Sequence, residues 1–157
     1  MNVGDLYRPD VQVVAPDEPL SAAARLLCEQ HVGALVVVDP RNPRRHPLGI
    51  LTDRDIVRGQ LERRADLYCL TVGDVMSTDP LLLPSSSGLA EAIEDLNSRS
   101  VRRAPVVDAS GSLLGIITLD ELLPALAREL AGLADLMATH PAEQRAQRGQ
   151  PPGTGDP

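Results

Sequence analysis

A hydroxyl and a carboxylate lie three residues apart near the centre of this sequence, in Thr52 and Asp55. The apolar residues before them predict a short buried strand at 48–51, and a helix is expected to begin near Asp53. Thr52 would then accept a hydrogen bond from the first helical turn, where the helix dipole also favours the carboxylate of Asp55. Such a corner can bind a sugar hydroxyl on the carboxylate, and a phosphate on the hydroxyl and the free amides. The same pattern also describes an ordinary helix cap.

The corner occurs twice in the chain. Thr118 and Glu121 repeat the hydroxyl and the acid 66 positions further on, again after a glycine and an apolar run. Upstream of the corners, residues 3–39 align with residues 72–108 at an offset of 69, with eleven identities. Two copies of one structural unit are therefore expected.

The composition argues against several classes of function. The 157 residues carry a net charge of −7, which disfavours a nucleic-acid surface, and they include two tyrosines but no phenylalanine or tryptophan to stack on bases. We find no signal peptide and no apolar run of membrane-spanning length. Three histidines are scattered without a nucleophile or metal-ligand motif, so neither catalysis nor a metal site is expected. We predict a cytoplasmic protein that is not an enzyme, with Cys28 as a buried thiol on an apolar helix face.

Each repeat is expected to contain the same succession of elements. Hydrophobic periodicity predicts a short strand, an amphipathic helix, two further strands and a closing helix. In the first repeat the strands are expected at 11–14, 34–38 and 48–51, with a helix at 20–30; in the second they are expected at 81–83, 105–107 and 113–117, with a helix at 89–99. A repeat of about 67 residues has a marginal core, so the two repeats should pack on each other.

The predicted boundaries divide the chain into three segments. Residues 1–68 form the first repeat with its linker, residues 69–138 the second repeat, and residues 139–157 a disordered tail without periodicity. The closing helix of the second repeat is expected at 119–137, with one apolar stripe formed by Leu122, Leu126, Leu130, Leu133 and Met137. This stripe either packs on its own domain or contributes to a dimer interface.

Several motifs together resemble a known family. They are Val3-Gly4-Asp5 with Val72-Gly73-Asp74-Val75-Met76, the strand segments 32–39 and 101–108, and the two Gly-Ile-x-Thr phrases. On these motifs the chain resembles a stand-alone pair of CBS (cystathionine β-synthase) domains, called a Bateman module, from about residue 3 to residue 130. The resemblance implies an α/β (α+β) fold of two CBS repeats packed about a pseudo-twofold axis. Each repeat would have a small three-stranded sheet with two helices on one face.

The resemblance also implies a ligand site in the cleft between the repeats. In the family, a Ser or Thr and an Asp three residues later hold phosphate and ribose, and a basic residue before the buried strand reaches the phosphates. Thr52 and Asp55 match this pattern and rank first, although Ala34 stands where the basic residue is expected. Arg54, Arg58 or an arginine of the other repeat could supply that cation. A second-ranked pocket would use Arg102, Arg103, Thr118 and Glu121, and the resemblance places Val13, Val14, Leu35 and Val36 around adenine.

The function implied by the resemblance is regulatory. The protein is expected to bind AMP, ADP, ATP or S-adenosylmethionine, to need no cofactor, and to signal to an unknown protein partner by a conformational change. A homodimer is expected, without nucleic-acid or membrane partners. The alternative is an interaction or dimerisation module that keeps the fold but has degenerate ligand sites, because neither half-site is complete.

Overall fold

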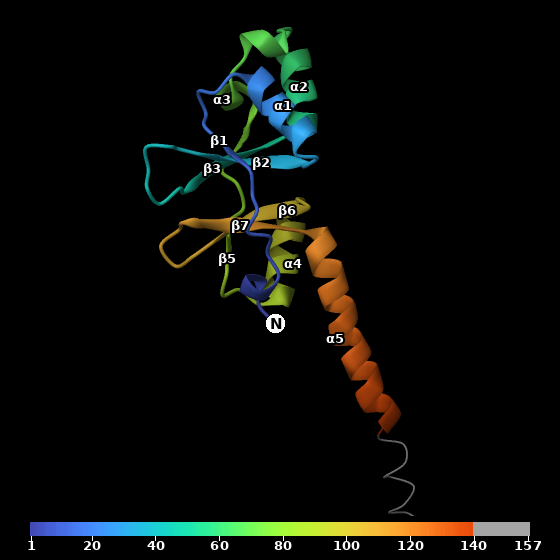
Figure 1. Cartoon of the computed structure of the whole chain (residues 1–157). Helices are drawn as coiled ribbons and strands as arrows, with labels where there is room; N and C mark the ends of the chain where they lie inside the picture. Colours follow the sequence, from blue (N-terminus) through green and yellow to red (C-terminus); the bar gives the residue numbers. More distant parts are fainter. Residues whose placement is uncertain (140–157) are drawn as a thin grey trace, which may run out of the picture. The chain divides into compact units, whose positions relative to one another are not determined.

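The computed structural model describes residues 1–139, which contain two similar α/β repeats (Figure 1). The first repeat contains β1 (Val13–Val14), α1 (Leu20–Glu29), β2 (Ala34–Val38), β3 (Pro47–Thr52) and α2 (Asp53–Arg63). The second contains β5 (Leu83–Pro84), α4 (Leu89–Ser98), β6 (Arg103–Val107), β7 (Leu113–Thr118) and α5 (Leu119–Thr139). Short elements lie outside these sets: η1 (Val3–Asp5), η2 (Leu67–Cys69), α3 (Val72–Val75) and β4 (Ser77–Thr78). The predicted fold class is confirmed.

The two sheets share one topology. In each sheet the short first strand pairs in parallel with the central strand, which pairs in antiparallel with the next strand, giving β1-β2-β3 and β5-β6-β7. All five residues of β2 are buried, because this strand is covered on both faces. Helices α1 and α2 lie on the same side of the first sheet in Figure 1. Strands β3 and β7 each end at a threonine, and a helix begins at the next residue.

The opening turns of the two repeats are exchanged. The amides of Val3 and Gly4 donate to the carbonyls of Ser87 and Ser85, at 2.9 and 2.8 Å. At equivalent positions, Val72 and Gly73 donate to the first repeat, to the carbonyls of Glu18 and Pro16. Each repeat is therefore completed by the segment that opens the other.

The residues after each opening turn extend the other repeat's sheet. Strand β4 pairs with β3 through Ser77 and Ile50, so the first sheet has a fourth strand that the sequence pattern did not predict. Arg8 pairs with Ile116 of β7 in the same way, through two backbone hydrogen bonds of 2.8 and 3.0 Å. The predicted boundary between residues 68 and 69 stays a prediction, since these segments cross it.

Large aliphatic side chains fill the core. Leu20, Leu35 and Leu51 are fully buried in the first repeat, and Leu83 and Ile117 in the second. Each such side chain stabilises the fold by about 1.5–3 kcal/mol relative to an exposed position.

The prediction that Cys28 is a buried thiol was wrong, because the thiol is exposed. The buried stripe of α1 consists of Leu20, Ala23 and Leu27. This stripe is narrower than the predicted face, and Cys28 lies beyond its edge.

The chain divides into two compact units, residues 1–122 and residues 123–157. Both sheets belong to the first unit, while the second contains the outer part of α5. The predicted disordered tail lies outside the described residues except for Thr139, which ends α5. No helix in the described part of the chain is long and apolar enough to cross a membrane.

Candidate functional site

A pocket of about 520 Å³ lies within the first unit and is lined by residues of both repeats. The first repeat contributes the end of β3 and the first turn of α2. The exchanged strand β4, the end of α4 and the start of β6 supply the remaining walls. The lining residues are Ile50, Thr52, Asp53, Arg54, Asp55, Arg58, Ser77, Thr78, Asp79, Pro80, Leu81, Arg99, Ser100, Val101, Arg102 and Arg103. We refer to it below as the inter-repeat pocket.

Thr52 and Asp55 form a reciprocal helix cap in the wall of this pocket. The amide of Asp55 donates to the Thr52 hydroxyl oxygen at 3.2 Å, as the sequence predicts. In return, the amide and the hydroxyl of Thr52 both donate to Oδ2 of Asp55 at 2.9 Å. The corner is thus a helix cap whose residues also line the inter-repeat pocket, and its binding of a ligand stays a prediction.

The second oxygen of the Asp55 carboxylate is also engaged. Arg58 donates to Oδ1 at 2.8 Å, and the Ser77 hydroxyl donates to the same atom at 3.4 Å. A carboxylate accepts about four hydrogen bonds, and Asp55, only 6 % exposed, receives four from these neighbours. A sugar hydroxyl would therefore have to replace one of these donors, and the long bond from Ser77 is the weakest.

The backbone amides at this corner are less available than the sequence suggested. The amides of Thr52 and Asp55 bond within the cap, and the amide of Arg54 donates to the Asp53 carboxylate at 2.9 Å. The expectation that free amides meet a phosphate is therefore wrong for these three groups. Any anion in the pocket must be bound mainly by cationic side chains.

Arginines supply that positive charge. Among the described residues that line the pocket, five are arginines and three are aspartates, a net charge of +2 in a chain whose net charge is −7. Arg58 is paired with Asp55, and Arg99 is paired with Asp79 at 3.2 Å. Within residues 1–139, the guanidinium groups of Arg54, Arg102 and Arg103 form no ion pair. These three groups can bind an anion without first breaking an internal pair.

Arg103 also reaches across to the first repeat. A Cβ atom added to Gly33 would lie 2.9 Å from Nη1 of Arg103, so the guanidinium packs directly against this glycine. Gly33 precedes Ala34, the position where the first repeat lacks its expected basic residue. The cation of the second repeat therefore lies beside that position.

Thr118 and Glu121 form a second corner outside the inter-repeat pocket. The Thr118 amide and hydroxyl donate to Oε2 of Glu121 at 2.8 and 2.7 Å, which matches the pattern at Asp55. The longer glutamate side chain still closes the cap, and its other oxygen lies 3.9 Å from Nε of Arg8. The second predicted pocket, which combined Arg102 and Arg103 with Thr118 and Glu121, is therefore not formed as a unit. Arg102 and Arg103 line the inter-repeat pocket together with Thr52 and Asp55.

The four aliphatic residues predicted around adenine lie in the first sheet. Val14, Leu35 and Val36 are buried, and Val13 pairs with Val36 between β1 and β2. None of the four is among the described residues that line the inter-repeat pocket. Ile50, Leu81 and Val101 provide its apolar surface instead.

Sequence reasoning missed the contribution of residues 77–81. They reach the pocket only because β4 crosses to the other repeat's sheet, which no periodicity reveals. One available signal was the identity of Asp10 and Asp79 in the repeat alignment, because it marked this segment as part of the repeated unit.

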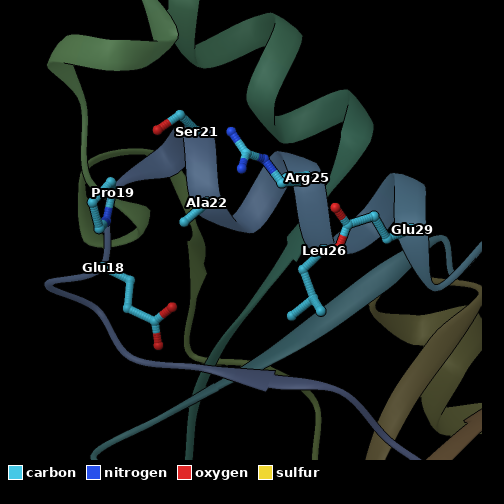
Figure 2. Close-up of a pocket in the computed structure, with 7 residues that line it drawn as sticks. All are labelled: Glu18, Pro19, Ser21, Ala22, Arg25, Leu26 and Glu29. Carbon is cyan, nitrogen blue, oxygen red and sulfur yellow. The ribbon is translucent and has the colours of Figure 1, made fainter.

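A second pocket, of about 380 Å³, lies along α1 and the turn before it. Figure 2 shows its lining side chains, which are Glu18, Pro19, Ser21, Ala22, Arg25, Leu26 and Glu29. Its charged groups are of both signs, and no predicted site residue lies there. In the described part of the chain, no group of three or more His, Cys, Asp or Glu side chains is arranged to hold a metal ion.

The sequence matches the CBS domain family over residues 3–62 and 72–128. The chain belongs to this family and contains a tandem pair of CBS domains, as the motifs predict.

Individual relatives agree with this assignment. The chain is 31% identical over 140 residues to the CBS domain-containing protein YhcV of Bacillus subtilis, covering 88% of this chain and 96% of that protein. It is 29% identical over 123 residues to the uncharacterized protein MK0525 of Methanopyrus kandleri, covering 78% of this chain but only 61% of that longer protein. The solved structure of CBSX2 in complex with AMP is 32% identical, with a TM-score of 0.68 over 81% of this chain and 96% of that chain.

Proposed function

We propose that this CBS pair binds an adenine nucleotide in the inter-repeat pocket. The observation that carries the proposal is the meeting of the Thr52–Asp55 corner with three arginines that form no ion pair within residues 1–139. The volume of about 520 Å³ suits such a ligand, since small-molecule pockets measure about 300–1,000 Å³. The AMP complex of the similar protein CBSX2 supports this choice, with ADP, ATP and S-adenosylmethionine as the other ligands to test.

The proposed roles follow from the charge and position of each group. Arg54, Arg102 and Arg103 bind the phosphates, because guanidinium groups suit bidentate contact with phosphate oxygens. Asp55 accepts a hydrogen bond from the ribose in place of the long bond from Ser77. The apolar side chains of Ile50, Leu81 and Val101 contact the base.

The proposed output is a change in how the two repeats contact each other. Arg103 packs on Gly33 of the first repeat, so a phosphate that draws the guanidinium into the pocket changes this contact. Such a ligand favours one arrangement through its differential affinity. The response would pass to a protein partner, and no catalytic role is proposed.

The experiment is to titrate the protein with AMP, ADP, ATP and S-adenosylmethionine, and to measure binding by calorimetry and by the shift in thermal unfolding. A ligand at about 100 times its dissociation constant should stabilise the protein by about 2.7 kcal/mol. Arg103→Ala should weaken binding about tenfold to a hundredfold, because one charge-assisted contact is lost. Arg25→Ala, on the outer side of α1, is the matched control and should bind like the wild type. Equal losses in both variants would contradict the placement of the site.

A second candidate function is a protein-interaction module without a ligand. The saturation of Asp55 by internal donors favours it, since a carboxylate with four hydrogen bonds gains little from a ribose. Under this hypothesis, none of the four compounds raises the melting temperature. In that case Asp55→Ala lowers the stability of the protein, and neither the variant nor the wild type binds any of the four compounds.

A further inference from the structure

The arginines of the inter-repeat pocket have no cationic counterparts at the equivalent positions of the other repeat. By the alignment offsets of 69 and 66, Arg54 corresponds to Asp120, Arg58 to Pro124, Arg99 to Gln30, Arg102 to Gly33 and Arg103 to Ala34. The backbone agrees with this alignment, because His31 and Ser100 have φ angles of 51° and 52°. Since both repeats form the same sheet topology, the fold does not require a cation at any of these positions. The gathering of arginines in one pocket therefore points to an anionic ligand.

The charged groups of the pocket lie at different depths. The side chain of Asp55 is 8% exposed, whereas those of Arg99 and Asp79 are 50% and 83% exposed. The Thr52–Asp55 corner is thus in the inner part of the pocket, and the ion pair between Arg99 and Asp79 is at its rim. An exposed ion pair contributes little to stability, so a phosphate can replace Asp79 as the partner of Arg99 at small cost.

The charge of the pocket discriminates among adenosyl ligands. The lining residues carry a net charge of +2. Each further phosphate of a nucleotide adds about one negative charge, which this pocket attracts. S-adenosylmethionine has a sulfonium and an ammonium group against one carboxylate, and its net positive charge is repelled.

A single phosphate does not use all of the cations. Beside a ribose at Asp55, it is bound by the unpaired guanidinium groups of Arg54, Arg102 and Arg103, and Arg99 keeps its partner Asp79. A chain of two or three phosphates extends further from the ribose, towards the rim. We propose that the ligand is a nucleoside polyphosphate, and that Arg99 distinguishes it from a monophosphate. This inference rests on the proposed nucleotide site.

The test is calorimetric titration of the full chain with AMP, ADP, ATP and S-adenosylmethionine, without divalent cations. Affinity of the wild type should rise from AMP to ATP by at least about tenfold, because charge-assisted contacts are added, and S-adenosylmethionine should bind more weakly than AMP. Inorganic triphosphate should also bind more weakly than ATP, since it lacks the ribose and the base.

The decisive variant is Arg99→Gln, which introduces the residue that the first repeat has at the equivalent position, Gln30. It should lose about tenfold in affinity for ATP and much less for AMP, so that the ratio of the two affinities falls towards one. Arg25→Gln, on the outer side of α1, is the matched control and should keep the wild-type ratio.

The outcomes separate this inference from the proposed function. Equal affinities of the wild type for AMP and ATP overturn the inference but leave the nucleotide site in place, as does an Arg99→Gln variant with the wild-type ratio. Tighter binding of S-adenosylmethionine than of ATP overturns the inference as well, and triphosphate binding as tight as ATP binding overturns the assignment to a nucleoside. If no nucleotide binds, the proposed function itself fails.

Discussion

At both the Thr52–Asp55 corner and the Thr118–Glu121 corner, the threonine amide and hydroxyl donate to the acid, but different groups surround the two acids. At the first corner, Arg58 and Ser77 donate hydrogen bonds to the carboxylate of Asp55. At the second, Nε of Arg8 lies 3.9 Å from Oε1 of Glu121. The position equivalent to Arg58 is Pro124, which has no charge, and Arg8 occupies the position equivalent to Ser77. The comparison shows that the repeat preserves the local cap, while the neighbouring segments determine which corner opens onto a cationic pocket.

The largest expected effect concerns the glycines that precede the two corners. A Cβ at Gly49 would lie 2.5 Å from the carbonyl oxygen of Ser77, and one at Gly115 would collide with the carbonyl of Arg8 and the ring of Tyr7. Because backbone atoms cannot move aside cheaply, each alanine substitution should lower the free energy of unfolding by about 1–3 kcal/mol. Chemical denaturation measures the change.

The control for these variants is Gly88→Ala, because a Cβ at Gly88 meets nothing within 4 Å. Gly88 is the N-cap residue of α4, where glycine is preferred over alanine, so this variant should lower the free energy of unfolding by less than about 1 kcal/mol. If Gly49→Ala and Gly115→Ala were equally harmless, the two exchanged segments would not lie against the glycines as described.

A smaller effect is expected when the acids of the two corners, Asp55 and Glu121, are replaced by alanine. Asp55→Ala should lower the free energy of unfolding by about 1–2 kcal/mol, because it removes a cap and the ion pair between Asp55 and Arg58. Glu121→Ala should cost about 1 kcal/mol or less, since Arg8, its ion-pair partner among the described residues, lies 3.9 Å from the carboxylate and is exposed. Thermal unfolding of both variants, with and without AMP, provides the measurement. Equal loss of AMP affinity in both variants would contradict the assignment of the ligand to the first corner.

The smallest effect concerns the cap of the second opening turn and its dependence on pH. The backbone amide of Thr71, together with its hydroxyl, holds the pKa of the Asp74 carboxyl below its usual range. A lowered pKa means that Asp74 contributes its full stability above the pKa of the unfolded chain, about 3.9, and loses it as pH falls through the folded value. Asp74→Ala should therefore be less stable than the wild type at neutral pH and equal to it in strong acid. Urea midpoints measured across this range check the prediction, and a difference that persists in acid would contradict it.

Much of the fold could be predicted because the sequence contains two copies of one repeat, so an element predicted in one copy is supported by the other. The alternation of apolar residues located the central strands and both amphipathic helices to within a few residues, and the offset of the alignment matched equivalent elements. The burial of Cys28 was predicted wrongly because periodicity gives the centre of an apolar face but not its width. The exchanged segments could not be predicted, since a two-residue strand such as β4 has no detectable pattern.

The candidate site could be predicted from the sequence only in part. Thr52, Arg54, Asp55, Arg102 and Arg103 were identified from their types and from the family resemblance, and they line one pocket. The resemblance could not show that Asp55 already has four donors. Nor could it show that Ile50 of β3, rather than the valines of β1 and β2, lines the pocket.

The exchanged opening turns have a consequence for how the chain folds during synthesis. The first sheet gains its last strand from residues 77–78, and the first opening turn bonds to residues 85 and 87. The first repeat is therefore incomplete when the ribosome has made only that repeat, and both repeats reach their final contacts late and together. Contacts between residues so far apart in sequence slow folding, and they tie the two halves into one cooperative transition. A protease that cuts the linker at residues 64–71 should consequently destabilise both repeats at once, instead of releasing two stable fragments.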